Sequence, residues 1–370
     1  MTDFLVFSDF HAHNFNAFSK PVSYKNGTIN SRLKDCLDVI AQMRAYAKAN
    51  KIRCVLFGGD LFHSRSAVKT DVYNTIYAAI EEWVTLEGIN LIAIPGNHDM
   101  ADRQGLVHSL EGFKRIKDFQ TAGQLIVKDQ VDSHPYDAIN IVCVPYTVDR
   151  EEAVKRLQLA GAEVDKYGKP AILLAHLGMQ GAKVGSDYVL VSDSDISVSD
   201  VPHDKFSICL FGHYHQHQQL FDNGWFIGAT HHHNWGDAGT KRGFLHLKVD
   251  RKTGEATFKQ IETETPRFCH VNGPVPNLSM PRRKDFIRVH SDVEITEELK
   301  QSMLPTMGPN VEIVMKRKKT EESTFELKEE DIHPAGLVEA WVKDKHGGLD
   351  QDKLKQIGMN LLAKAESRSL

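Results

Sequence analysis

Five short apolar segments in this 370-residue chain each end in side chains that can bind metal ions. The clearest is NLIAI (90–94), which is followed at once by PGNHD (95–99). The other segments span 4–7, 52–57, 171–175 and 206–211, and they lead into SDFHAH, GGDLFH, a histidine and GHYH. Short apolar runs with such polar ends are typical of buried strands. Because ligands bind beyond the carboxyl ends of strands in open α/β sheets, the five ends predict one shared site.

The candidate ligands offer carboxylate, imidazole and amide groups but no thiolate. This set suits Mn²⁺, Fe²⁺ or a catalytic Zn²⁺ better than a structural zinc. Seven candidates are too many for one tetrahedral ion and fit two metal ions. They are Asp9, His11, Asp60, Asn97, His176, His213 and His215. Glycines at 58, 59, 96 and 212 allow tight turns and a close backbone approach to this site.

The segments between the strands predict a parallel sheet covered by helices. Apolar residues recur at helical spacing over 32–48 and 72–83, between the first three strands. This β-α-β-α-β order implies parallel strands. GWFIGAT, RGFLHLKVD and ATFKQIE, within 224–262, are expected to be antiparallel. A proline-rich basic stretch after residue 273 predicts a linker, followed by a small β-α-β module and two amphipathic helices.

Composition sets the broad class of protein. The chain is 41% hydrophobic and 25% charged, which is ordinary for a soluble protein. No transmembrane helix or signal peptide is expected, and five scattered cysteines without CxxC spacing favour the cytoplasm. A net charge of −4 provides no general attraction to nucleic acid and does not exclude it.

The ordered motifs D-x-H, G-D-x-x-H, G-N-H-D, H and G-H-x-H, over residues 9–215, resemble the calcineurin-like metallophosphoesterases. Within that superfamily the chain is most similar to the SbcD-type nuclease and its phage counterparts, the nuclease subunit of the Mre–Rad type DNA-repair complex. The D-x-x-H form of the second motif, the segment GWFIGAT followed by KRGFLHLKVD, and the tail after residue 283 carry this likeness.

The resemblance implies an α/β fold, a metallophosphoesterase β-sandwich with flanking helices in α/β/β/α order. The expected domains are a nuclease domain at 1–272, a β-α-β capping domain at 283–319, and C-terminal helices at 334–366 that bind an ATPase partner.

The resemblance also implies a role for each site residue. Asp9, His11, Asp60 and His215 would hold one divalent ion, with Mn²⁺ the expected metal. Asp60, Asn97, His176 and His213 would hold the other, so that Asp60 bridges the two. His98, positioned by Asp99, would contact the scissile phosphate or protonate the leaving oxygen. His63 would also face the phosphate. His231, His232 and His233 are expected in a surface loop near the cleft, with a ligand role less favoured.

The function implied is a metal-dependent DNA nuclease, a 3′–5′ exonuclease on duplex ends and an endonuclease on single strands. Its expected partners are DNA, an SbcC-type ATPase with a coiled coil, and a second copy of the chain. The homodimer would form through residues 70–85 and 101–117, where Tyr73, Tyr77 and Trp83 are aromatic residues of a kind enriched at interfaces. Two alternatives remain: a small-molecule phosphodiesterase or phosphomonoesterase, and a scaffold that has lost its metals.

Overall fold

The computed structural model describes residues 1–25, 27–65, 67–101, 107–168, 170–184, 188–189, 195–272, 284–291, 310–315 and 356. One compact unit comprises residues 1–290 and 295–314, and a second comprises 291–294 and 315–370. The helix expected in the β-α-β module, EITEELKQSML (294–304), lies outside the described residues, as do the C-terminal helices at 334–366 apart from Gln356. Among the described residues, no helix combines the length and apolar character that a membrane span requires.

The first unit contains a six-stranded mixed sheet. Its strand order is β16-β15-β1-β4-β5-β6. The parallel strands are β1 (Thr2–Phe7), β4 (Cys54–Phe57), β5 (Asn90–Ala93) and β6 (Gln124–Val127). β15 (Gly243–Val249) pairs antiparallel with β1 and with β16 (Ala256–Glu262). The predicted β-α-β-α-β order is confirmed in this sheet.

A second six-stranded sheet has the order β13-β14-β12-β9-β8-β7. Its strands are β7 (Asp132–Tyr136), β8 (Ile139–Val144), β9 (Ala171–His176), β12 (Ile208–Gly212), β13 (Gln218–Phe221) and β14 (Gly224–Phe226). β8, β9, β12 and β14 are parallel, whereas β7 and β13 are antiparallel to their neighbours. The expectation that GWFIGAT is antiparallel to the strands that follow it was wrong. The β13–β14 hairpin returns the chain beside β12 in the second sheet.

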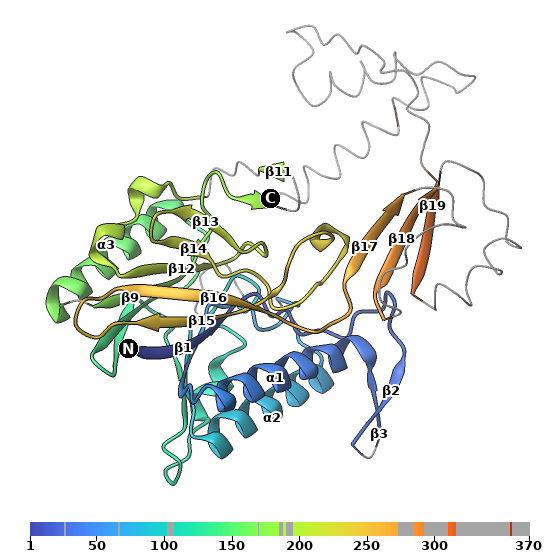
Figure 1. Cartoon of the computed structure of the whole chain (residues 1–370), viewed down its shortest axis with the longest axis horizontal. Coiled ribbons are helices and arrows are strands. Elements are labelled where there is room, and N and C mark those ends of the chain that lie inside the picture. Colours follow the sequence, from blue (N-terminus) through green and yellow to red (C-terminus); the bar gives the residue numbers. More distant parts are fainter. Residues whose placement is uncertain are drawn as a thin grey trace, which may run out of the picture. The chain divides into compact units, whose positions relative to one another are not determined.

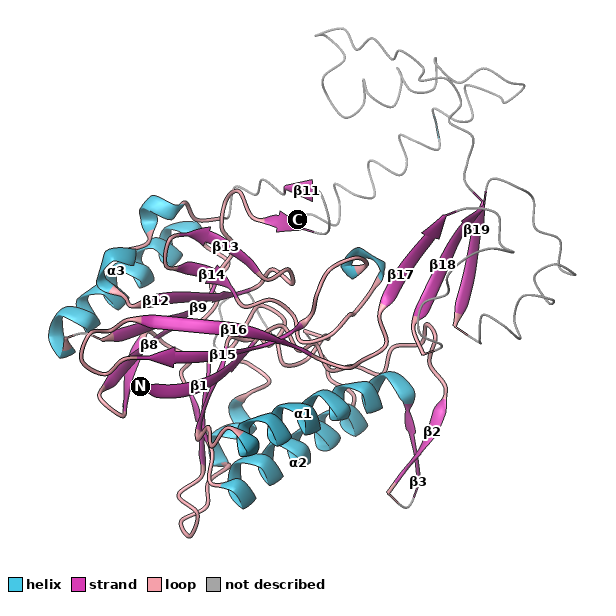
Figure 2. Cartoon of the chain, in the orientation of Figure 1, coloured by secondary structure: helices cyan, strands magenta, loops and turns pink. Residues whose placement is uncertain are grey.

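The two sheets face each other, and helices cover their outer faces (Figures 1 and 2). Side chains alternate along β1: Phe4 and Val6 enter the core between the sheets, whereas Leu5 and Phe7 face the helices. α1 (Ser31–Ala49) and α2 (Thr70–Glu87) pack on the first sheet, and α3 (Arg150–Tyr167) packs on the second. This four-layer α/β/β/α arrangement confirms the predicted fold class.

Local signals fix the ends of the helices. The Asn30 side chain accepts from the N–H groups of Arg32 and Leu33 and begins α1. Asp149 caps α3 by accepting from Glu152 N–H. α2 ends at Gly88, which adopts the left-handed conformation with φ 62°.

A three-stranded sheet contains β17 (Phe268–Asn272), β18 (Phe286–Ser291) and β19 (Val311–Met315). β17 pairs in parallel with β18, so this sheet joins the end of the expected 1–272 domain to the expected 283–319 module. Both domain boundaries stay predictions.

The remaining described elements are short. They are β2 (Pro21–Tyr24), β3 (Gly27–Asn30), β10 (Lys183–Val184), β11 (Tyr188–Val189), and the 3₁₀ helices η1 (Glu111–Arg115), η2 (Val198–Asp200), η3 (His203–Lys205) and η4 (Trp235–Asp237).

One of the three aromatic residues expected at the dimer surface is not exposed. Trp83 is buried in the core beneath α2 with 1% of its surface exposed, so it cannot contact a second copy. Tyr73 and Tyr77 are partly buried against Phe113, with ring centroids 5.6 and 5.1 Å away.

Candidate metal centre

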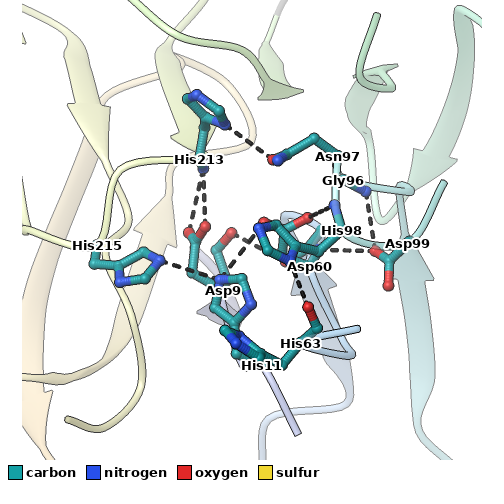
Figure 3. Close-up of polar contacts among 12 residues, drawn as sticks. Asp9, His11, Asp60, His63, Gly96, Asn97, His98, Asp99, His213 and His215 are labelled. Carbon is teal, nitrogen blue, oxygen red and sulfur yellow. Dashed lines mark hydrogen bonds and ion pairs between the residues drawn. The ribbon is translucent and has the colours of Figure 1, made fainter. Parts of the chain in front are cut away.

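The structure brings all seven predicted ligands together at the carboxyl ends of β1, β4, β5, β9 and β12. Figure 3 labels six of them, all except His176. His11 Nε2 lies 3.1 Å from His215 Nε2 and 3.5 Å from an oxygen of Asp60. Asp60 also lies 3.6 Å from His176 Nε2. Within the seven predicted ligands, two overlapping sets have the spacing of metal ligands: Asp9 with His11 and His215, and Asp9 with Asp60 and His176. His11 also forms such a set with His63 and His98. The centre of the group is therefore the pair of carboxylates Asp9 and Asp60.

The backbone of the site is held in an uncommon conformation. Asp9, His11, Asp60 and His213 have φ angles of 49°, 49°, 63° and 109°, which non-glycine residues seldom adopt. Such conformations persist where the surrounding structure enforces them, and they cluster at functional sites. They turn consecutive polar side chains toward one point as each strand ends.

Two glycines permit the close approach of these loops. A Cβ atom at Gly59 would lie 2.5 Å from Nδ1 of His176, and one at Gly96 would lie 2.2 Å from an oxygen of Asp60. Neither position has room for a side chain. This confirms the close-approach role predicted for these glycines.

Hydrogen bonds to backbone carbonyls set the tautomers of two site histidines. His176 Nδ1 donates to Gly58 O at 2.6 Å, which leaves a lone pair on Nε2 in the neutral ring. That Nε2 faces Asn97 Oδ1 at 3.0 Å, and His213 Nδ1 lies 3.0 Å from the same oxygen. His233 Nε2 donates to Asp9 O at 3.0 Å, directly behind the carboxylate pair.

The electrostatics of the site favour a bound positive charge. Burial, reinforced by the charges of Asp9 and Asp99, raises the pKa of Asp60 well above its usual value. Burial also raises the pKa of Asp9. Burial and neighbouring histidines lower the pKa of His11 and His176 far below normal and that of His213 to about 4. Buried carboxylates beside neutral imidazoles are stabilised together by a divalent cation.

The ligand atoms that converge here therefore fit bound metal ions. With Asn97 Oδ1 facing inward, this oxygen meets Nε2 of His176 and Nδ1 of His213, and Asp60 lies beside them, so acceptor atoms of four residues converge as metal ligands do. The division of ligands between two ions, and Mn²⁺ as the metal, stay predictions.

Asp99 does not position His98, contrary to the prediction from sequence. Its buried carboxylate accepts from the backbone N–H groups of Asp60, Leu61 and Gly96 at 2.8, 3.0 and 3.0 Å. His98 instead donates from Nδ1 to His63 O at 2.6 Å, and its own N–H donates to Asp60 Oδ1 at 2.7 Å. Asp99 thus ties the second ligand loop to the third.

His63 and His98 lie beside the carboxylates. Their rings stack with centroids 5.6 Å apart and an interplanar angle of 24°. Burial lowers the pKa of His98, while its bond to His63 O raises it; burial and the neighbouring His98 lower the pKa of His63 to about 4. Both rings remain partly exposed, so they border the open side of the cluster.

The prediction that residues 231–233 lie in a surface loop was wrong, because all three histidines are buried. The His233 ring lies 5.0 Å from that of His11 and 5.1 Å from that of His215. His231 lies deeper, with Nε2 3.7 Å from Cys36 Sγ. These rings form an inner wall behind the ligands.

Sequence reasoning missed three residues around the cluster. Asp237 is buried, pairs with Arg242 at 2.7 Å and lies 3.7 Å from Nδ1 of His215, where it can orient that ring. The ring of Tyr146 stacks on His213 with centroids 6.1 Å apart. Arg65 follows the second motif by two residues, and a cation so close to the motif was the available signal.

A comparison with protein families agrees with this fold. Residues 2–217, more than half of the chain, match the family described as Calcineurin-like phosphoesterase. A search of curated proteins found no match. Among solved structures, a dimetal phosphatase from Danio rerio is 10% identical, with a TM-score of 0.43, over 70% of this chain and 98% of that one. GAP50, the anchor in the inner membrane complex of Plasmodium, is 10% identical, with a TM-score of 0.39, over 71% and 89%. Likenesses this weak say nothing about substrate.

Proposed function

The chain belongs to the calcineurin-like phosphoesterase family, whose members hydrolyse phosphoester bonds, and we propose that this member is a DNA nuclease. It would cleave phosphodiester bonds in DNA as an exonuclease on duplex ends and an endonuclease on single strands. It would serve as the nuclease subunit of an SbcCD-type repair or recombination complex. The observation that carries the proposal is the convergence of two buried carboxylates, an amide oxygen and imidazole nitrogens beside two open histidines.

The roles follow from the contacts. Asp9, His11, Asp60 and His215 would hold one divalent ion, and Asp60, Asn97, His176 and His213 the other. Bound ions of this kind activate water and neutralise phosphate charge. His98 has Nδ1 committed to His63 O, so Nε2 is the atom with which it would bond to the phosphate or carry a proton.

Several features support DNA over a small substrate. The second motif has the D-x-x-H form of the SbcD-type nucleases, with Asp60 at the centre of the cluster and His63 beside His11. β15 and β16 follow the last motif as an antiparallel pair, and β17–β19 add a sheet beyond the matched residues 2–217. His215 keeps 31% of its side chain exposed, so the ligand cluster opens toward solvent. The alternative, a small-molecule phosphodiesterase or phosphomonoesterase, would use the same core.

One experiment separates the two. Nucleotide release from linear duplex DNA is measured with Mn²⁺ and with EDTA, beside hydrolysis of bis-p-nitrophenyl phosphate. Mn²⁺-dependent DNA cleavage is expected. Hydrolysis of the small ester with no cleavage of duplex or single-stranded DNA would favour the alternative.

The proposal includes two protein partners. A homodimer through α2 and the segment after the third motif would use Tyr73 and Tyr77, which light scattering at micromolar concentration tests. Residues 334–366, with Trp341 and Leu361 as anchors, would bind an ATPase with a coiled coil. A pull-down with a chain lacking residues 330–370 tests this second contact, and undiminished ATPase binding would place the contact elsewhere.

A further inference from the structure

Arg65 places a positive charge at the mouth of the metal centre. It lies in the loop after β4, five residues beyond Asp60, and is exposed. Its charge acts on the pKa of Asp60, His98, His213 and Tyr146, groups that come from four different loops. A guanidinium in reach of these groups faces the place where a phosphate would enter.

The Asn97 amide connects Arg65 to the metal ligands. With Oδ1 inward, that oxygen lies 3.0 Å from both His176 Nε2 and His213 Nδ1, which suits a bound cation. With the amide rotated, its nitrogen donates to the same two atoms at 3.0 Å and to Asp60 Oδ2 at 3.2 Å. Its oxygen then accepts from Arg65 Nη2 at 2.7 Å. Without a cation the second orientation gives the two amide N–H groups acceptors and gives the amide oxygen a donor, whereas a cation requires the first.

The two orientations exclude each other. When Oδ1 turns inward to a metal ion, the amide N–H₂ group turns toward Arg65, and two donors then face one another. The exposed guanidinium is then released to water or to a bound anion. Among ligands that a phosphoesterase centre binds, a phosphate oxygen is the acceptor with the matching charge and geometry.

We propose that Arg65 is a phosphate-binding residue that metal loading releases from Asn97. In the metal-free chain it bonds to the amide oxygen of Asn97 and so competes with the metal ion for that ligand. In the metal-loaded chain it is free to contact a non-bridging oxygen of the substrate phosphate. The inference rests on the proposed phosphoester chemistry but not on DNA as the substrate.

The test compares wild type, Arg65→Ala, Arg65→Lys and Lys69→Ala in the full chain. Lys69 is an exposed cation at the start of α2, so its removal controls for a general loss of positive charge. Mn²⁺ binding to the metal-free protein is followed by the electron paramagnetic resonance of free Mn²⁺. Binding of inorganic phosphate to the Mn²⁺-loaded protein is followed by calorimetry, and thermal melting verifies that each variant is folded.

The expected effects have opposite directions. Arg65→Ala should bind phosphate about tenfold or more weakly, because a charge-assisted hydrogen bond is lost. It should bind Mn²⁺ as tightly as wild type or up to about fivefold more tightly, because a competing hydrogen bond is gone. Arg65→Lys should lie between wild type and Arg65→Ala in phosphate affinity, since it keeps the charge but not the planar fork. Lys69→Ala should change neither affinity.

Three results would overturn the inference: weaker Mn²⁺ binding in Arg65→Ala, unchanged phosphate binding in that variant, or an equal loss of phosphate binding in Lys69→Ala. The phosphate-binding measurement does not depend on DNA as the substrate. A wild-type chain that binds Mn²⁺ and phosphate but cleaves no DNA would therefore refute the nuclease proposal and leave the role of Arg65 intact.

Discussion

Replacing Asp99 tests whether this carboxylate holds the ligand loops together rather than orienting His98. Asp99→Ala removes the acceptor of the N–H groups of Asp60, Leu61 and Gly96, at 2.8, 3.0 and 3.0 Å, and of the Ser109 hydroxyl at 3.1 Å. A buried donor left without a partner costs about 1–3 kcal/mol. The Ser109 hydroxyl can rotate to another acceptor, and loss of a buried anion offsets part of the sum. We therefore expect the free energy of unfolding to fall by about 3–5 kcal/mol, a large part of the total for a domain.

Urea unfolding at neutral pH measures this change, with Asp99→Asn and Ser109→Ala as graded controls. The asparagine keeps one acceptor oxygen and should cost about 1–3 kcal/mol, and Ser109→Ala about 1 kcal/mol. Mn²⁺ affinity should fall with stability, because the N–H groups of Asp60 and Gly96 belong to two ligand loops. Two results together would refute the reasoning: a free energy of unfolding for Asp99→Ala within about 1 kcal/mol of wild type, and a shifted pH profile of cleavage. They would show that Asp99 acts on His98 rather than on the ligand loops.

Three further outcomes are expected. His98→Ser should abolish cleavage and keep the bound Mn²⁺ count of wild type, and loss of metal in step with activity would make His98 a ligand. Asp60→Ala should lose both ions by elemental analysis, because the proposed role has its carboxylate shared between them; one retained ion would contradict the bridging role. His231 has its pKa lowered by burial to about 3, whereas the unfolded chain keeps a value near 6.5. The unfolded state therefore binds the extra proton, and stability is lost as pH falls below 6.5, by about 2–3 kcal/mol from this residue at pH 4.5. Urea unfolding of His231→Gln at pH 7 and pH 4.5 should show a smaller pH dependence than wild type; an equal dependence would mean that His231 is not buried neutral.

The fold and the convergence of the seven candidate ligands could be predicted from the sequence, because both follow from local sequence patterns. Apolar runs that end in Asp9, Asp60, Asn97, His176 and His213 fix both the strands and the edge at which they end. Parallel pairing of β1 with β4 and β5, and of β9 with β12, then brings these ends together. α3 was missed, although Asp149 followed by Glu152 is a helix-start signal.

The contacts behind the candidate ligands could not be predicted from the sequence, because they join residues that are far apart along the chain. Asp99 follows His98 directly, and adjacency suggested a pair, yet its side chain points to backbone N–H groups of a loop some 38 residues earlier. His231, His232 and His233 resembled exposed loop residues because polarity usually marks a surface. Their burial is possible because the carbonyl of Asp9, the hydroxyl of Thr230 and the carbonyl of Thr240 accept or share their ring hydrogen bonds.

The inner wall explains why this site contains more histidines than its ligands require. His233 bonds to the carbonyl of Asp9 and lies against the rings of His11 and His215, so it fixes one ligand backbone and two ligand rings. A neutral imidazole can do this without adding charge, because burial keeps the pKa of His233 well below its usual value. A cation there would repel the metal ions, and a further carboxylate would raise the cost of burying Asp9 and Asp60. A buried neutral histidine therefore supports the carboxylate pair while it leaves the charge of the site to the bound ions.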